Sequence, residues 1–241
     1  MTRVKGQSAL ITGASRGIGR ASAIAFAKAG YRIGLISRNQ SALEAVAQEI
    51  HHLGGEAVVM AMDLTEVSQI PQRLTAFQAE LGEVEVLVNN AGMAYTGALA
   101  EMPLEQWQQL MTLNLTSVFQ CIQSILPQMR HRQRGTIVNV ISVAGKQAFP
   151  DWGAYCASKF GLMGLTKSLA QEERTHGIRV IAFCPGAVNT PLWDTDTVDA
   201  DFDRAAMLTP SDVAQAMVQT VTLPHHAVVE EIVLMPNAGT F

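Results

Sequence analysis

The chain has 241 residues, of which 48% are hydrophobic and only 16% are charged, and its formal net charge is −4. This length suits one large α/β domain without disulfide bonds, and the low charged fraction leaves apolar surface for a subunit interface. The small negative charge argues against nucleic acid as the main partner, and no apolar run approaches the ~20 residues of a membrane span. Three scattered cysteines, six histidines without metal-ligand spacing and no signal peptide predict a cytoplasmic protein that holds no metal.

Strand-like and helix-like runs alternate along the whole chain. The first kind predicts strands near Ser8–Thr12, Tyr31–Ser37, Ala57–Met62, Val84–Asn89, Thr136–Ser142, Arg179–Cys184 and Val228–Met235. The second predicts helices at Gly17–Ala29, Ser41–Leu53, Val67–Leu81, Leu104–His131, Trp152–His176 and Ser211–Leu223, with left-handed stops at Gly30, Gly54, Gly82, Gly135 and Gly177. Because the strands lack polar alternation, we expect one domain over residues 1–241: a doubly wound parallel sheet with helices on both faces.

A glycine-rich turn joins the first predicted strand to the first helix. Thr12-Gly13-Ala14-Ser15-Arg16-Gly17-Ile18-Gly19 has the spacing G-x-x-x-G-x-G, which differs from the common dinucleotide fingerprint G-x-G-x-x-G. Both spacings give a tight turn, bring backbone close to a pyrophosphate and aim the positive end of a helix at it. By itself the turn is also compatible with a structural strand–helix corner.

Other motifs follow later strands: Asn89-Asn90-Ala91-Gly92 after the fourth, Ser142 at the end of the fifth, and Pro185-Gly186 after the sixth. Tyr155 and Lys159 lie four residues apart on one predicted helix, and Asn114 lies within another. Together with the glycine turn, these motifs resemble those of the short-chain dehydrogenase/reductase family, in its single-domain branch. The resemblance implies a Rossmann-type fold with a seven-stranded sheet and an oxidoreductase with a nicotinamide cofactor.

The end of the second predicted strand indicates which nicotinamide cofactor is bound. Ser37 stands where an enzyme that prefers NAD places a carboxylate, and Arg38 is next to it. Arg16 supplies a second cation for a 2′-phosphate, so we expect NADPH/NADP+. The alternative is two solvated surface arginines.

The resemblance also assigns roles to the other predicted cofactor residues. Asp63 accepts a hydrogen bond from the adenine amino group, although it could instead cap the next helix. The backbone at Val188 and the Thr190 hydroxyl bind the carboxamide. The full predicted set is Gly13, Ser15, Arg16, Gly17, Ile18, Gly19, Ser37, Arg38, Asp63, Leu64, Asn90, Ala91, Gly92, Tyr155, Lys159, Pro185, Gly186, Val188 and Thr190.

The expected chemistry is reversible reduction of a carbonyl to an alcohol. A lysine ammonium and a cationic oxidised nicotinamide both lower the pKa of a tyrosine. Tyr155 then donates a proton to the carbonyl oxygen as hydride reaches the carbon, while Lys159 tunes it and binds the ribose. The resemblance assigns Ser142 to positioning the substrate oxygen. Asparagine is unfavourable within a helix, and the resemblance assigns Asn114 to disrupting the helical hydrogen bonds and holding a relay water. Alone, such a Tyr/Lys pair is commonly a surface pair.

The segment Pro191–Leu208 is the expected lid. It carries five aspartates against one basic residue, Arg204, and Trp193 is placed to pack over the substrate. The alternative is a mobile loop whose charges touch nothing.

The substrate class stays open between a general carbonyl compound and a 3-oxoacyl group on an acyl-carrier protein. The chain resembles 3-oxoacyl-carrier-protein reductases, and the cluster Arg130, His131, Arg132 and Arg134 could dock an acidic carrier or interact with its own helix dipole. The acidic lid and the ending Met235–Gly239 argue against the carrier. Less favoured alternatives are a non-catalytic NADP sensor, and a sugar-nucleotide epimerase, which needs a larger C-terminal region.

A homodimer or homotetramer is expected. The helices Leu104–His131 and Trp152–His176 resemble those that pair across subunits in this family. They carry apolar residues that could equally serve the core, namely Phe119, Ile122, Phe160, Leu165 and Leu169.

Overall fold

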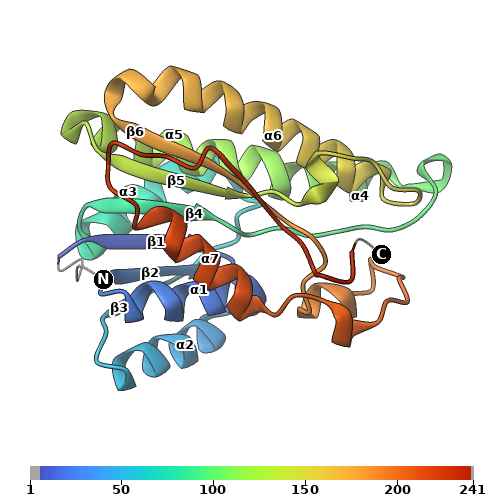
Figure 1. Ribbon diagram of the computed structural model, residues 1–241, viewed down its shortest axis with the longest axis horizontal. Helices are drawn as coiled ribbons and strands as arrows, with labels where there is room; N and C mark the ends of the chain where they lie inside the picture. The colour runs from blue at the N-terminus through green and yellow to red at the C-terminus, as the bar shows by residue number, and fades with distance from the viewer. Residues whose placement is uncertain (1–5, 240–241) are drawn as a thin grey trace.

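A computed structural model describes residues 6–239, which form a parallel sheet between two layers of helices (Figure 1). The seven strands have the order β3-β2-β1-β4-β5-β6-β7, and every neighbouring pair is parallel. Their bounds are β1 Ser8–Thr12, β2 Arg32–Ser37, β3 Ala57–Ala61, β4 Val84–Asn89, β5 Gly135–Val140, β6 Ile178–Pro185 and β7 Glu231–Leu234. The predicted Rossmann-type doubly wound fold is confirmed.

Two apolar cores lie on opposite faces of this sheet. Helices α1 (Gly17–Lys28), α2 (Gln40–His52) and α7 (Pro210–Val221) pack on one face through residues such as Phe26 and Met217. Helices α3 (Ile70–Leu81), α5 (Ser117–Arg132) and α6 (Gly153–Glu173) cover the other, and the short α4 (Leu104–Met111) contacts α6. Strands β1, β4, β5 and β6 are buried along their whole length, which explains why their sequences are mostly apolar and lack a regular alternation of apolar and polar residues.

The order of the strands positions the site. The chain moves outward from β1 through β2 to β3, and then crosses to β4 on the other side of β1. Ligands of such sheets bind beyond the carboxyl ends of the strands where the order reverses. The glycine turn after β1 and the Asn89–Gly92 segment after β4 therefore meet at this point.

The structure corrects several sequence-based boundaries, of which three change the description of the fold. The continuous helix expected at Leu104–His131 is two helices joined by a π-helical turn, Thr112–Thr116. The left-handed stop of α5 falls on Gln133, with φ 51°, because Gly135 is already the first residue of β5. The last strand is Glu231–Leu234, shorter than the predicted Val228–Met235.

No helix among residues 6–239 combines the length and the apolar character needed to cross a membrane.

Candidate active site

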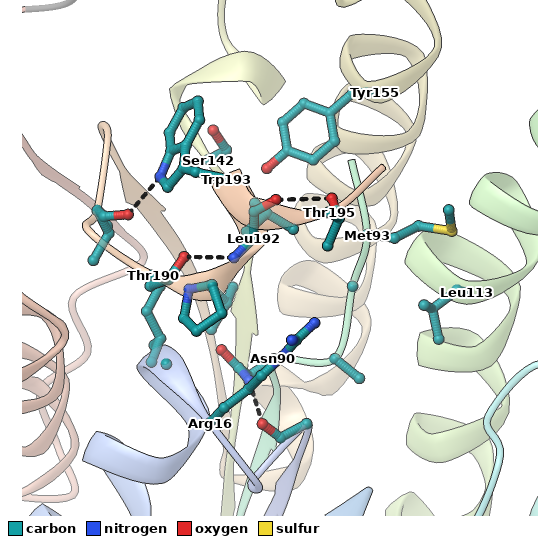
Figure 2. Close-up of a pocket in the computed structure, with 18 of the residues that line it drawn as sticks. Arg16, Asn90, Met93, Leu113, Ser142, Tyr155, Thr190, Leu192, Trp193 and Thr195 are labelled. Atoms are coloured by element: carbon teal, nitrogen blue, oxygen red, sulfur yellow. Dashed lines mark hydrogen bonds between the residues drawn. The ribbon is translucent and has the colours of Figure 1, made fainter. Parts of the chain in front are cut away.

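A cavity of about 610 Å³ lies at the carboxyl edge of the sheet, and the segments that follow strands β1 to β6 all contribute to its lining. Every residue predicted for the site lines this cavity except Gly19 and Asn114, which are buried. Figure 2 shows the Tyr155 hydroxyl directed into the cavity, with Trp193 and Leu192 on one side and Met93 and Leu113 on the other.

The glycine turn is held tightly against the segment after β4. Thr12 Oγ1 accepts hydrogen bonds from the backbone N–H groups of Asn90 and Ala91, both at 3.0 Å. Asn90 Nδ2 donates to the carbonyl of Thr12 at 2.9 Å. At Gly13, where φ is +67°, a Cβ would lie 2.9 Å from both the Ala91 Cα and Asn90 Nδ2, and at Gly19 it would collide with the Gly13 carbonyl. Only glycine allows this approach.

The N-terminus of α1 opens onto the cavity beside this turn. The helix begins at Gly17, its N-cap residue Arg16 makes no capping hydrogen bond with its side chain, and its first turn contains no acidic residue. The first N–H groups of a helix have no partner within the helix, and they attract anions. This end of α1 therefore suits a pyrophosphate.

Arg16 and Arg38 extend this positive region. Both line the cavity, both are exposed, and neither forms an ion pair with any residue in the range 6–239. Ser37, at the end of β2, accepts a hydrogen bond from the Asn39 N–H at 3.3 Å. Two unpaired guanidinium groups beside a serine fit a phosphate monoester better than a pair of ribose hydroxyls.

Asp63 has a structural contact as well as a place on the cavity wall. Its Oδ1 accepts hydrogen bonds from the Thr65 N–H at 2.9 Å and the Thr65 hydroxyl at 2.8 Å. Burial opposes ionisation of Asp63, but these two bonds and the nearby charge of Arg38 together hold its pKa below the usual value. Its Oδ2 accepts no hydrogen bond from the described residues, so a local turn and an adenine contact are compatible.

Tyr155 and Lys159 lie one turn apart on α6 and face the cavity together. Lys159 is only 5% exposed, and its Nζ donates a hydrogen bond to the Val140 carbonyl at 3.0 Å and lies 5.6 Å from the centroid of the Tyr155 ring. Burial lowers the pKa of Lys159 to about 8. Burial raises the pKa of Tyr155 to about 12, although a hydrogen bond with Ser142 opposes this rise. Without a bound cofactor, burial therefore outweighs the lowering of the Tyr155 pKa that we expected from Lys159. Tyr155 carries its proton at neutral pH.

Ser142 has an unusual backbone conformation. It lies two residues beyond the end of β5 rather than inside the strand, with φ 153°, a region that side-chain-bearing residues rarely adopt. Its Oγ accepts a hydrogen bond from the Ala144 N–H at 3.1 Å, which leaves the hydroxyl proton available to a neighbouring oxygen.

Asn114 lies behind the cavity wall, in the π-helical turn. Its Oδ1 accepts a hydrogen bond from the Met93 N–H at 2.9 Å, and its Nδ2 donates to the Met93 carbonyl at 2.9 Å and to the Ser158 hydroxyl at 3.0 Å. Ser158 in turn donates to the Tyr155 carbonyl at 2.7 Å. The side chain thus ties the segment after β4 to the turn of α6 that carries Tyr155 and Lys159.

The predicted lid is fixed to the rest of the protein. Arg204 donates to Asn189 Oδ1 at 2.9 Å and to the Thr190 carbonyl and Asp194 Oδ1, both at 3.0 Å. The Thr197 hydroxyl donates to the Ala94 carbonyl at 2.8 Å. The alternative of a loop whose charges touch nothing is therefore wrong at Asp194 and Arg204.

Several residues of the cavity wall were not predicted. Met93 follows the Asn90–Gly92 motif, and the others come from α4 with the π-helical turn, from the segment before α6, and from the predicted lid, where only Trp193 was expected to pack over the substrate: Gln109, Leu113, Phe149, Trp152, Leu192, Thr195, Thr197 and Phe202. One of these residues could have been predicted from its spacing. Trp152 precedes Tyr155 by three residues, which places the two rings on the same side of the helix start, and their centroids are 5.6 Å apart.

The basic cluster at the end of α5 is neutralised within the protein. Arg130 Nε donates to Glu173 at 2.8 Å, and Glu173 is fully buried. Arg132 pairs with Glu83 at 3.2 Å, and Arg134 Nε donates to Glu85 at 2.6 Å. These arginines anchor α5 to its neighbours, so neither carrier docking nor the helix dipole is needed to explain them.

An apolar groove of about 430 Å³ runs between α5 and α6 on the outside of the molecule. Ile122, Leu165 and Leu169 line it, together with Phe119, which is 42% exposed. Phe160, on α6, is 46% exposed.

Within residues 6–239 there is no cluster of three or more His, Cys, Asp or Glu side chains that could hold a metal ion.

Comparison with known proteins agrees with this geometry. Residues 7–200 match the short chain dehydrogenase family. The chain is 37% identical to a 3-oxoacyl-[acyl-carrier-protein] reductase of Synechocystis sp., over 83% of this chain and 81% of the relative. It is 35% identical to a sepiapterin reductase of Chlorobaculum tepidum, over 95% of this chain and 96% of the relative.

Solved structures share the fold over almost the full length. A metagenomic short-chain oxidoreductase in complex with NADP is 35% identical, with a TM-score of 0.86 over 98% of this chain and 99% of the other. An actinorhodin polyketide ketoreductase with NADPH is 34% identical, with a TM-score of 0.87 over 97% of this chain and 96% of the other.

Proposed function

Since this chain belongs to the short-chain dehydrogenase/reductase family, we propose that it is an NADPH-dependent oxidoreductase that reduces a ketone, aldehyde or 3-oxoacyl carbonyl to an alcohol, reversibly. The observation that carries the proposal is the shared cavity: the Tyr155 hydroxyl enters it beside Ser142 and Lys159, while two unpaired arginines line it. A proton donor and an anion site in one cavity suit hydride transfer from a phosphorylated dinucleotide.

NADPH, when bound, supplies the hydride that adds to the carbonyl carbon. Arg16 and Arg38 would hold its 2′-phosphate, and the glycine turn with the N-terminus of α1 its pyrophosphate. Asp63 would accept from the adenine amino group. The carboxamide would meet Val188 and Thr190, which Trp193 and Arg204 hold in place: Trp193 Nε1 donates to the Val188 carbonyl at 2.7 Å. The named relatives with NADP or NADPH support this choice of cofactor.

Tyr155 is the proton donor in this mechanism. Its hydroxyl gives its proton to the carbonyl oxygen, which gains negative charge as the carbon is reduced. Ser142 hydrogen-bonds the same oxygen and fixes its position. The Lys159 ammonium stabilises the phenolate left on Tyr155 and hydrogen-bonds the ribose.

Asn114 acts on Tyr155 and Lys159 indirectly, by holding the turn of α6 that carries them in place. Both protons of its side-chain amide are donated to protein partners, so a relay water would bind at its remaining oxygen lone pair or at a backbone carbonyl of the π-helical turn.

Reduction of a 3-oxoacyl group on a carrier protein is the second candidate, favoured by the identity to the Synechocystis reductase. The internal pairing of Arg130, Arg132 and Arg134 disfavours it, since no free basic patch remains there for an acidic carrier.

The deciding experiment is a screen of NADPH oxidation with aldehydes, ketones, diketones and acetoacetyl-carrier protein, repeated with NADH. We expect turnover of free carbonyl compounds and at least about tenfold lower kcat/KM with NADH, because the two arginines lose their phosphate partner. Turnover of the carrier substrate alone would select the second candidate. Binding of NADPH without turnover of any carbonyl would instead indicate a non-catalytic sensor.

We further propose that two copies pair through the α5–α6 groove, with Phe119 and Phe160 at the contact, to give a dimer or part of a tetramer. The supporting observation is that these large side chains stay exposed beside an apolar groove.

A further inference from the structure

The outer half of the cavity, beyond Tyr155 and Ser142, differs from the cofactor half in its charge. Among the described lining residues only Arg16, Arg38, Asp63 and Lys159 are charged, and these belong to the proposed cofactor and catalytic positions. The remaining part, which we call the outer chamber, is lined by residues of the segment after β4, α4, the π-helical turn, the segment before α6 and the lid, among them Met93, Gln109, Leu113, Trp152, Trp193 and Phe202. The aspartates of the lid do not line it.

Aromatic rings form a continuous wall of this chamber that starts at the proton donor. Trp152 packs edge-to-face on Tyr155, with centroids 5.6 Å apart, and on Trp193 at 5.8 Å. Trp193 packs on Phe202 at 5.3 Å with an interplanar angle of 89°. The hydrogen bond from Trp193 Nε1 to the Val188 carbonyl fixes its ring. These contacts hold the rings edge-to-face, so the wall presents ring faces and edges suited to packing against another ring.

The polar side chains of the chamber offer little to a charged substrate. The hydroxyl protons of Thr195 and Thr197 are already donated, to the Leu192 and Ala94 carbonyls. The Gln109 amide, one helical turn before Leu113 on the same wall, makes no hydrogen bond with any described residue, so it can donate a hydrogen bond to a substrate but carries no charge to neutralise an anion. An anionic group would lose its hydration in this chamber without finding a cation.

We propose that this chamber selects uncharged carbonyl compounds with a planar ring next to the carbonyl, such as aryl ketones, and discriminates against carboxylated or phosphorylated substrates. This rests on the function proposed above and names its substrate class. The substrate ring would lie between Trp193 on one side and Met93 with Leu113 on the other, and the carbonyl oxygen would reach Ser142 and Tyr155; Figure 2 labels these residues around the cavity.

The first test compares NADPH-dependent kcat/KM for 4-acetylbenzamide and 4-acetylbenzoate, which share a shape and differ in charge. We expect kcat/KM for the neutral amide to be about a hundredfold higher, because the carboxylate of the benzoate would lose its hydration in an apolar site without gaining a cationic partner. Gln109→Arg supplies the missing cation from an exposed position and should reduce this preference at least about tenfold. Equal use of both substrates by the unmodified enzyme would overturn the inference.

The second test addresses the ring. The ratio of kcat/KM for acetophenone to that for cyclohexyl methyl ketone should fall about three- to tenfold in Trp193→Leu and fall less in Trp193→Phe, which keeps an aromatic ring but loses the Nε1 hydrogen bond. Comparing ratios cancels the different reactivities of the two ketones. An unchanged ratio in Trp193→Leu would contradict the proposal while leaving the reductase function intact. No NADPH oxidation with any carbonyl compound would instead refute the function itself.

Discussion

At the scale of single residues, burial acts in opposite directions on the two neighbouring groups of α6. It lowers the pKa of Lys159 to about 8 and raises that of Tyr155 to about 12, because both charged forms lose their hydration. Tyr155 is thereby kept in its protonated, acidic form, which the proposed reduction of a carbonyl requires. Lys159, by contrast, keeps its charge only by a small margin at neutral pH.

This margin predicts a pH dependence of cofactor binding. Since the folded-state pKa of Lys159 is lowered to about 8, its ammonium is present below that pH and is lost as the pH rises through it. NADPH affinity should therefore fall above about pH 8, by at most about tenfold per pH unit. Fluorescence titration of NADPH from about pH 6 to about pH 10 measures this. In Lys159→Arg, whose cation persists, the fall should vanish, and an unchanged pH profile in that variant would exclude Lys159 as its cause.

At the scale of elements, the sequence predicts the strands of the sheet well. It predicts the interruptions of the helices poorly. Strand β4 is an apolar run interrupted by Glu85 and ended by Asn89, and its bounds were predicted to the residue. The π-helical turn at Thr112–Thr116 was missed because one extra residue in a turn leaves the apolar pattern of a long helix almost unchanged. Motifs predicted most of the lining residues in the proposed cofactor half of the cavity, whereas its outer wall depends on contacts between distant segments.

The π-helical turn should be needed for stability as well as for geometry. Asn114→Ala removes three hydrogen bonds and leaves the Met93 N–H and carbonyl unpaired, so we expect a loss of about 2–4 kcal/mol in the free energy of unfolding. Ser117→Ala, nearby in the same helix, removes one bond within that helix and should cost about 1 kcal/mol or less. Urea unfolding measures both, and equal losses would show that Asn114 contributes no more than an ordinary helical hydrogen bond.

The lid provides a second prediction at this scale. Arg204 holds Thr190 and Asp194 together, so Arg204→Met should free the segment that we propose binds the carboxamide and raise the KM for NADPH about tenfold. Arg174→Met, which breaks an exposed ion pair with Glu230 elsewhere, is the matched control and should leave KM unchanged. Equal KM values in the two variants would argue against a role of Arg204 in cofactor binding.

At the scale of the whole molecule, the low fraction of charged residues has two structural reasons. Apolar cores cover both faces of the sheet, and an apolar groove between α5 and α6 is left exposed on the surface. The basic residues that suggested a docking site at the end of α5 are bonded to Glu173, Glu83 and Glu85 instead. No sequence pattern could show these pairings, since the partners lie more than forty residues apart. The α5–α6 groove is therefore the surface that we expect a second copy to cover.

Placing charge on that groove should separate the subunits. Phe119→Glu combined with Phe160→Glu buries two carboxylates at the proposed contact, so light scattering should show a monomer where the unmodified chain shows a dimer or tetramer. Leu53→Glu, at an exposed apolar residue at the end of α2, is the control and should not change the mass. A monomeric mass for the unmodified chain would remove the proposed interface.

The most direct test of the central claim is the proton donor itself. Tyr155→Phe deletes one hydroxyl while keeping the ring that packs on Trp152. NADPH oxidation with an accepted carbonyl substrate should fall at least about a hundredfold, whereas NADPH binding, measured by fluorescence, should change little. Full turnover by Tyr155→Phe would contradict the account, because the carbonyl oxygen would then receive its proton from another group.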